Sequence, residues 1–343
     1  MSDDRIRPII FLILLLFLPE RLLAEDIVIG MSAAFTGPSK GLGIELYRGS
    51  TAYLEHVNRT GGIYGHKIVI KPYDDGYNPI PAIRNTIKLI EQDNAFLLFN
   101  YVGTPTVTRM LPLLKSYKGR FVYLFSPFTG AEPLRQPPYG EYVFNLRASY
   151  SDETEGLVDH FVSTGRSRIA VFYQADAYGR SGWDGVKKAL AKNFGLKMVG
   201  EATYRRGAEY SQSFKEQVDV IRKASADVVI SIGAYAVCAA FIRDARNAGL
   251  NIPIANLSFV GSESMADLIL QNSRSAGKDY TKDLINSQVV PSYLDTALPA
   301  AQEYRQLMEK YQPLPPRDLM EAGYAPLPYS YVSFEGFLNA KLL

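Results

Sequence analysis

Short apolar segments alternate with longer segments in which apolar positions recur at helical spacing, and this alternation runs along the chain from residue 26. The clearest example is residues 96–126, where apolar runs at 96–100 and 121–126 flank a helical pattern at 107–117. Apolar runs of this length are typical of parallel strands buried on both faces, and a helix between them completes a βαβ unit. The pattern predicts an α/β fold built on doubly wound parallel sheets.

The same alternation occurs in both halves of the chain, which predicts two such sheets. In the first half we predict further strands at 26–33, 67–74 and 142–146, with helices from about 44 to 59, at 81–93 and at 152–164. In the second half we predict strands at 169–173, 197–204 and 228–232, with helices at 182–193, 211–224 and 237–248. Towards the end we predict strands at 256–263 and 287–293, a surface loop at 272–283, and helices at 300–311 and 331–343.

Two loops of the first half carry the candidate chemistry. The loops at 101–106 and 127–131 follow neighbouring strands, so they meet at the carboxyl edge of the sheet, where open α/β sheets bind ligands. They supply the hydroxyls of Thr104, Thr106 and Thr129, and Gly103 and Gly130 allow close approach of the backbone. An anion such as a carboxylate could be held there by loop N–H groups and a helix start. The alternative is that these are ordinary βα turns.

Tyrosines occupy the corresponding positions of the second half. Tyr178 and Tyr235 each follow a predicted strand, mirroring the threonine loops, and a third tyrosine, Tyr150, lies in the polar segment 147–151 before a helix. We include all three as candidate ligand contacts. The alternative for Tyr178 and Tyr235 is that they only cover the ends of their strands.

The first residues have the composition of a secretory signal peptide. Arg5 and Arg7 precede an apolar run at 9–18 that is too short to cross a bilayer, and a small residue, Ala24, precedes Glu25. We expect cleavage after Ala24 and a mature protein outside the inner membrane. The alternative is an uncleaved amphipathic anchor.

Composition excludes several classes of function. The chain of 343 residues has a formal charge of +2 and no basic block, so it lacks the electrostatic signature of a nucleic-acid-binding protein. Cys238 is the only cysteine, and the three histidines lie in no metal-ligand spacing, so we expect neither a disulfide nor a metal site. Gly41-Leu42-Gly43 lacks the third glycine of a dinucleotide fingerprint. We expect no cofactor.

An ordered set of motifs covers nearly all of the predicted mature chain. It consists of Thr36-Gly37-Pro38, Gly43, Gly49, Gly61-Gly62-Ile63-Tyr64-Gly65, Asp74-Asp75 with Pro79, Ser126-Pro127, Tyr178-Gly179 and Glu335-Gly336. In this order the motifs resemble the branched-chain amino-acid (Leu/Ile/Val-binding) type of periplasmic substrate-binding protein, the bilobed receptors of ABC transporters. The resemblance implies the type I periplasmic-binding fold, in which two Rossmann-like lobes close on a small solute. It places the signal peptide at 1–24, the first lobe at 25–147, the second at 148–284, and a return to the first lobe and the crossing region at 285–343.

The resemblance also implies site residues. First-lobe contacts would fall near Leu42, at 104–106 and at 128–130, and second-lobe contacts on Tyr178, Tyr235 and Glu263, with Glu263 as partner of a ligand ammonium. The alternative for Glu263 is that it only favours the start of the following helix. The complete candidate set is Thr104, Thr106, Phe128, Thr129, Gly130, Tyr150, Tyr178, Tyr235 and Glu263.

Three departures from the family pattern leave the ligand open. Leu42 stands where an aromatic residue is common, Phe128 replaces a small residue, and Gly130 replaces a hydroxyl residue. The solute is therefore expected to be an amino acid or a related small carboxylate, not necessarily leucine, isoleucine or valine. The chain also ends in a helix where relatives continue through further strands, which leaves open whether the crossing region is complete.

These observations lead to three alternative functions. The first is a monomeric, periplasmic receptor that delivers its solute to the membrane permease subunits of an ABC transporter. The second is a ligand-sensing module for a separate signalling partner. The third, a secreted enzyme, lacks support because there is no G-x-S-x-G elbow and Asp74-Asp75 is typical of a turn with capping residues.

Overall fold

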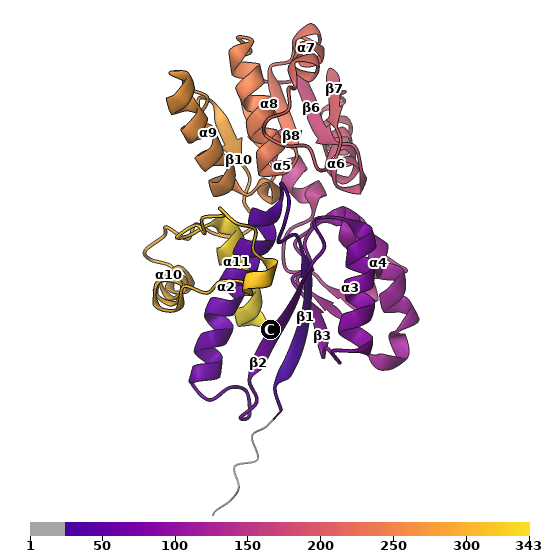
Figure 1. The fold of residues 1–343 in the computed structure, drawn as a ribbon. Coiled ribbons are helices and arrows are strands. Elements are labelled where there is room, and N and C mark those ends of the chain that lie inside the picture. Colours follow the sequence, from indigo (N-terminus) through magenta and orange to yellow (C-terminus); the bar gives the residue numbers. More distant parts are fainter. Residues whose placement is uncertain (1–24) are drawn as a thin grey trace, which may run out of the picture.

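The computed structural model describes residues 25–343, so the predicted signal peptide at 1–24 lies outside the described residues. Two α/β lobes are arranged one above the other (Figure 1), each around a five-stranded sheet. This confirms the prediction of two doubly wound lobes.

The lower lobe in Figure 1 contains a parallel sheet with strand order β2-β1-β3-β4-β5. Its strands are β1 (Ile27–Ala33), β2 (Ile68–Asp74), β3 (Leu97–Phe99), β4 (Leu124–Phe125) and β5 (Val143–Phe144). Its helices are α2 (Lys40–Arg59), α3 (Pro79–Glu91) and α4 (Thr104–Ser116). Helix α3 begins where the Asn78 side chain accepts a hydrogen bond from the Ile80 N–H and proline occupies the first helical position, which are both common start signals.

The upper lobe contains a second parallel sheet with strand order β10-β9-β8-β6-β7. Its strands are β6 (Ile169–Gln174), β7 (Gly200–Tyr204), β8 (Val228–Ile232), β9 (Ile254–Asn256) and β10 (Leu284–Asn286). Its helices are α5 (Tyr150–Ser163), α6 (Ala177–Phe194), α7 (Lys215–Lys223), α8 (Tyr235–Asn247) and α9 (Ser262–Ala276). Every residue of β8 is buried, as expected for a strand covered by helices on both faces.

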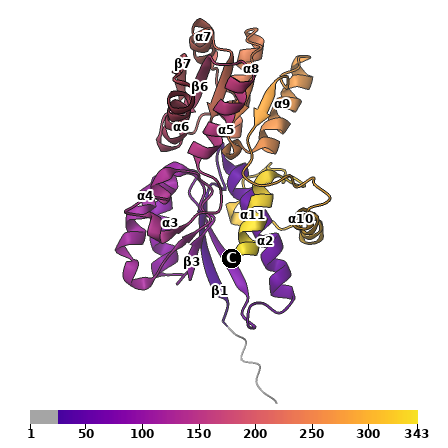
Figure 2. The ribbon, with the colours of Figure 1, turned by 180° about the vertical axis from the view of Figure 1, so that it is seen from behind.

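The last segment returns to the lower lobe. Helices α10 (Pro299–Tyr311) and α11 (Tyr331–Leu342) pack against α2, and both views show α11 beside α2 (Figure 2). A separate apolar cluster of Ala52, Ala301, Tyr304, Leu307, Met308, Phe334 and Phe337 joins the three helices. Short 3-10 helices connect the main elements at Lys118–Arg120, Glu132–Leu134, Gly140–Tyr142, Ser258–Val260 and Arg317–Leu319.

Two segments cross between the lobes. Residues 145–149 lead from β5 to α5, and Ser149 begins α5 with a capping box, in which its hydroxyl accepts from the Asp152 N–H and the Asp152 carboxylate accepts from the Ser149 N–H. Residues 287–298 lead from β10 back to α10.

Three predictions towards the end of the chain are wrong. Residues 287–293 form no strand; the strand lies at Leu284–Asn286, and Pro291, which has no N–H to donate, interrupts the predicted segment. The strand predicted at 256–263 ends at Asn256, where a 3-10 helix and then α9 follow through Gly261, whose φ is +73°. The first part of the loop predicted at 272–283 is helical, because α9 continues to Ala276.

Among residues 25–343, no helix combines the length and apolar composition that crossing a bilayer requires.

Candidate ligand site between the lobes

The two threonine loops lie side by side, as predicted. Val102 and Phe128 form a parallel bridge beyond the ends of β3 and β4, and the Gly103 N–H donates to the Phe128 carbonyl at 3.2 Å. The Thr104 and Thr129 hydroxyls are hydrogen-bonded to each other at 2.7 Å and are buried. Gly103 has a φ of +97°, and a Cβ there would lie 2.1 Å from the Tyr77 ring, so only glycine fits at this start of α4.

Two candidates of these loops have local structural roles. The Thr106 hydroxyl donates within its own turn, with the Val102 and Gly103 carbonyls at 2.5 and 2.7 Å. The Gly130 carbonyl accepts from the Tyr150 N–H at 2.8 Å, and a Cβ at Gly130 would lie 2.7 Å from that nitrogen. Gly130 therefore allows the crossing segment to pack against the threonine loop.

Aromatic rings from both lobes meet beside these loops. Phe259, from the 3-10 helix before α9, lies with its ring centroid 5.4 Å from Phe128 and 4.5 Å from Tyr178. The Tyr150 and Tyr178 rings are 5.1 Å apart. Tyr77 of the lower lobe reaches the same cluster, 6.0 Å from Phe259, and its hydroxyl accepts from Gln174 of β6 at 3.3 Å. The structure thus brings Phe128 and Tyr178 together around Phe259, with Tyr150 against Tyr178.

Arg147 is a charged residue at this junction that the sequence interpretation did not select. Its guanidinium lies 4.4 Å from the Phe128 ring centroid and donates to the Ser258 hydroxyl. Its Nε is 3.5 Å from the Glu335 carboxylate and its Nη2 is 4.0 Å from that of Glu153. All three charged side chains are buried, and the two acids keep the pKa of Arg147 above its usual value despite burial. A lone arginine in the short crossing segment between strand and helix was the signal that could have identified it.

Glu153 connects several segments at the junction. Its carboxylate accepts from the Ser258 N–H at 2.9 Å, from the Ser258 hydroxyl at 3.0 Å and from the Ser287 hydroxyl at 2.7 Å. Glu335, on α11, is buried without such donors, and burial raises its pKa to about 7 while Arg147 partly opposes the shift. The junction therefore holds one permanent positive charge, an acid that accepts several hydrogen bonds and a second acid, Glu335, whose pKa is raised by burial.

Tyr235 and Glu263 form a second group, near the starts of α2 and α11. The Tyr235 hydroxyl accepts from the Gly41 N–H of α2 at 3.2 Å. One Glu263 oxygen accepts from the N–H of Tyr331, the first residue of α11, at 3.1 Å. Burial raises the pKa of Glu263, and the hydrogen bond from Tyr331 is among the contacts that oppose this rise. Each residue thus links the upper lobe to a helix of the lower part, and Glu263 stabilises the start of α11 in addition to its place in the first turn of α9.

Four buried donors of the first group have no hydrogen-bond partner among the described residues: the Tyr150 hydroxyl, the Tyr178 hydroxyl, and Nε and Nη1 of Arg147. Burial raises the pKa of both tyrosines, so both hydroxyls are protonated at neutral pH. The hydroxyls of Thr129 and Thr104 partly oppose this rise at Tyr150, but their geometry does not complete a hydrogen bond to it. Unpaired buried donors are costly, and they indicate a site whose partner is an acceptor.

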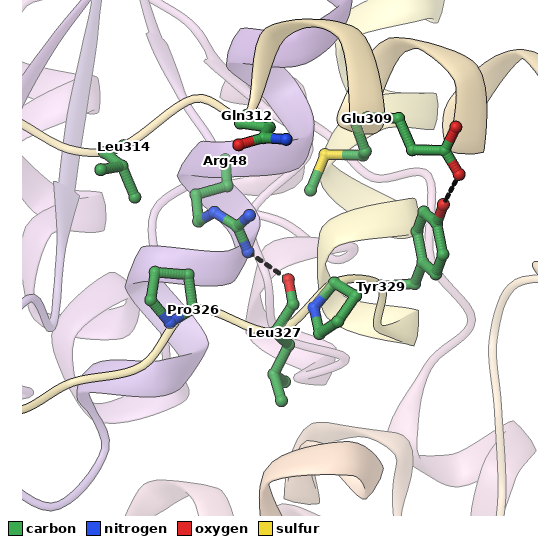
Figure 3. Close-up of a pocket in the computed structure, with 9 residues that line it drawn as sticks. Arg48, Glu309, Gln312, Leu314, Pro326, Leu327 and Tyr329 are labelled. Atoms are coloured by element: carbon green, nitrogen blue, oxygen red, sulfur yellow. Dashed lines mark hydrogen bonds between the residues drawn. The ribbon is translucent and has the colours of Figure 1, made fainter.

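A separate groove lies between α2 and the proline-rich segment 313–328 (Figure 3), with a volume of about 400 Å³. Its lining residues are Arg48, Met308, Glu309, Gln312, Leu314, Pro326, Leu327, Pro328 and Tyr329. The Arg48 guanidinium donates hydrogen bonds to the Glu45 carboxylate and the Leu327 carbonyl, both at 2.6 Å, and to the Pro313 carbonyl at 3.0 Å. None of the nine candidate residues lines this groove. Arg48, its one cationic lining residue, links α2 to the proline-rich segment through these hydrogen bonds.

Within residues 25–343, no three His, Cys, Asp or Glu side chains are grouped so that they could hold a metal ion.

Comparison with known proteins places the chain in a family. The sequence model described as "Periplasmic binding protein" matches residues 26–327. A solved structure of a possible leucine/isoleucine/valine-binding protein from Rhodopirellula baltica SH 1 is 30% identical with a TM-score of 0.80, and the match covers 94% of this chain and 80% of that one.

Curated relatives agree with this assignment. An amino acid binding protein of Pseudomonas aeruginosa is 26% identical over 264 residues, which are 76% of this chain and 66% of the relative. The Leu/Ile/Val-binding protein of Escherichia coli K12 is 25% identical over 257 residues, which are 73% of this chain and 65% of the relative. The matched part thus spans just under two thirds of these two relatives. With a family match over 26–327 and the same bilobed fold, this chain belongs to the periplasmic binding protein family.

Proposed function

We propose that the protein is an extracytoplasmic receptor that captures an amino acid or a related small carboxylate and delivers it to the permease subunits of an ABC transporter. The observation that carries the proposal is the junction between the lobes, where Tyr150, Tyr178 and Arg147 hold buried donors without partners. The names of the relatives, which include amino acid binding and Leu/Ile/Val-binding proteins, support an amino acid or a molecule of similar chemistry.

Ligand capture follows from the arrangement of the lobes. Phe128 and Thr129 come from the lower lobe and Tyr178 and Phe259 from the upper lobe, so a solute between them contacts both. A ligand with contacts to both lobes binds the closed form better than the open form and shifts the population towards closure. We take the crossing segments 145–149 and 287–298 as the hinge of this motion and the signal peptide as directing the protein to the periplasm.

A thermal-shift screen tests the binding role. Residues 25–343 are heated with L-amino acids, small aliphatic and aromatic acids, and their amides. A ligand that binds only the native state at 100 times its Kd adds about 2.7 kcal/mol to the free energy of unfolding, so we expect a rise of several degrees in Tm for one chemical group of the panel. If no solute of the panel raises the Tm, the proposed function is wrong.

Uptake measurements test the transport role. Deletion of the gene should reduce uptake of the solute found in the screen, and restoring the gene should recover it. Unchanged uptake together with tight binding would favour the sensing module over the transport receptor.

A further inference from the structure

The unpaired groups at the junction share one chemical property. Nε and Nη1 of Arg147 can only donate hydrogen bonds, and the Tyr150 and Tyr178 hydroxyls each have a proton to donate. They belong to one cluster, because the Tyr150 and Tyr178 rings are 5.1 Å apart and the Arg147 guanidinium lies 4.4 Å from Phe128, which Phe259 joins to Tyr178. A group that satisfies all three residues has to accept several hydrogen bonds, as a carboxylate does.

The charges around Arg147 leave part of its guanidinium available. The Glu335 and Glu153 carboxylates lie 3.5 and 4.0 Å away, beyond the roughly 2.7–2.9 Å of a charge-assisted hydrogen bond. The Glu153 oxygens are already occupied by Ser258 and Ser287. Arg147 therefore has acidic neighbours but is incompletely hydrogen-bonded, and its planar guanidinium matches the geometry of a carboxylate.

The surroundings of this polar cluster are apolar. Phe128 lies under the guanidinium, and Phe259 bridges Phe128 and Tyr178 across the lobe boundary. Phe128 comes from the lower lobe and Phe259 from the upper lobe, so the two apolar ring faces belong to different lobes. Glu263, the predicted partner of an ammonium group, belongs to the second group of residues: one of its oxygens accepts from the start of α11, and the other is buried without a hydrogen-bond partner among the described residues.

We propose that Arg147, Tyr150 and Tyr178 bind the carboxylate of an organic acid whose apolar body packs between Phe128 and Phe259, and that this acid needs no α-ammonium group. The inference rests on the proposed function, since it assumes that the junction is the solute site. It adds Arg147 as a specificity-determining residue and narrows the ligand from amino acids and related acids to monocarboxylates with an apolar body.

Calorimetry on two matched sets of probes tests this. The first set is 3-phenylpropionate, its amide and L-phenylalanine; the second is hexanoate, its amide and L-norleucine. In at least one set we expect the acid to bind tenfold or more tightly than its amide and at least as tightly as the amino acid. Equal binding of acid and amide, or amino acids that bind tenfold more tightly than the acids, would overturn the inference.

Removal of single hydroxyl groups tests the residues. Tyr150→Phe and Tyr178→Phe should each weaken binding of the acid at least tenfold and leave the Tm of the ligand-free protein unchanged or higher, because each removes an unpaired buried hydroxyl. Tyr210→Phe is the matched control, since its hydroxyl is also buried without a partner but lies beside Arg243, outside the junction. Arg147→Lys should reduce the preference for acid over amide.

Outcomes separate this inference from the proposed function. Full affinity in both tyrosine variants refutes the inference while the protein remains a receptor. Binding of amino acids without binding of either acid does the same. Absence of any ligand in the thermal screen refutes the proposed function, and this inference with it.

Discussion

Glu335 is a buried acid at the junction, and its protonation affects the stability of the folded protein. Burial raises its pKa to about 7, compared with a usual value near 4.5, and Asp75 in the lower lobe is raised to about 7 for the same reason. At a pH between about 4.5 and about 7, Glu335 is more protonated in the native state than in the unfolded chain. The free energy of unfolding therefore falls as the pH rises towards and through 7.

Urea denaturation at pH 5.5 and pH 8 measures this dependence. We expect the ligand-free protein to be less stable at pH 8, by an amount on the order of 1 to 3 kcal/mol from Glu335. Glu335→Gln should remove that part of the difference and leave the part that belongs to Asp75. Glu216→Gln, on the exposed side of α7, serves as control. A pH dependence that is the same in Glu335→Gln and the wild type would contradict the assignment.

Glu263 contacts the start of α11, so its charge acts mainly on a helix terminus. Glu263→Gln should lower the free energy of unfolding by about 1 kcal/mol or less, because the amide oxygen can still accept from Tyr331 while the favourable interaction with the helix dipole is lost. Affinity for the best carboxylate ligand should stay within twofold. A large loss of affinity for amino acids would instead support the ammonium-binding role that the family resemblance implied.

Helices α2 and α11 are held together by close backbone approach. A Cβ at Gly49 of α2 would lie 1.7 Å from the Ser333 carbonyl oxygen, and one at Gly336 of α11 would lie 2.2 Å from that of Leu46. These distances leave no room for a methyl group, and both obstacles are backbone atoms that cannot turn away. The two glycines, which belong to the motifs of the family, are thus explained by this helix crossing.

A single added methyl group tests the crossing. Gly336→Ala should destabilise the protein by about 1 to 3 kcal/mol or more, because the helices have to move apart. Gly156→Ala in α5 is the matched control, since a Cβ there would meet no heavy atom within 4 Å beyond its own stretch of helix and its φ is ordinary. That change should stabilise by about 0.5 to 1 kcal/mol through helix propensity. Chemical denaturation of both variants decides, and equal effects would rule out the close approach as the cause.

The two lobes are joined by contacts that depend on several distant segments at once. Arg147 and Glu153 connect the first crossing segment and α5 to Ser258, to Ser287 after β10, and to Glu335 on α11. Tyr235 and Glu263 add contacts to the starts of α2 and α11. A change in the relative position of the lobes has to alter these contacts together.

Sequence alone was sufficient to predict the two-lobed α/β architecture and the position of the threonine loops. Short apolar runs such as 228–232 indicate buried parallel strands, and the helical periodicity between successive runs indicates the helices that cover them. Both signals are local in the sequence. The positions of Thr104 and Thr129 followed from strand adjacency, because consecutive βα units place their loops at one edge. The strand at 284–286 was missed because three residues carry too little periodicity, and its pairing with β9 creates it.

Tertiary structure was needed to identify Phe259 and Arg147 and to find the hydrogen bond between Glu263 and the start of α11. Phe259 comes from a 3-10 helix that was interpreted as part of a strand, and it meets Phe128 only because the two lobes face each other. The environment of Arg147 is built from residues more than 100 positions apart in the sequence, Ser258 and Glu335 among them. Local pattern records burial and turn chemistry, whereas the direction in which a side chain points between two lobes depends on how distant segments pack, and hydrophobic periodicity does not encode that.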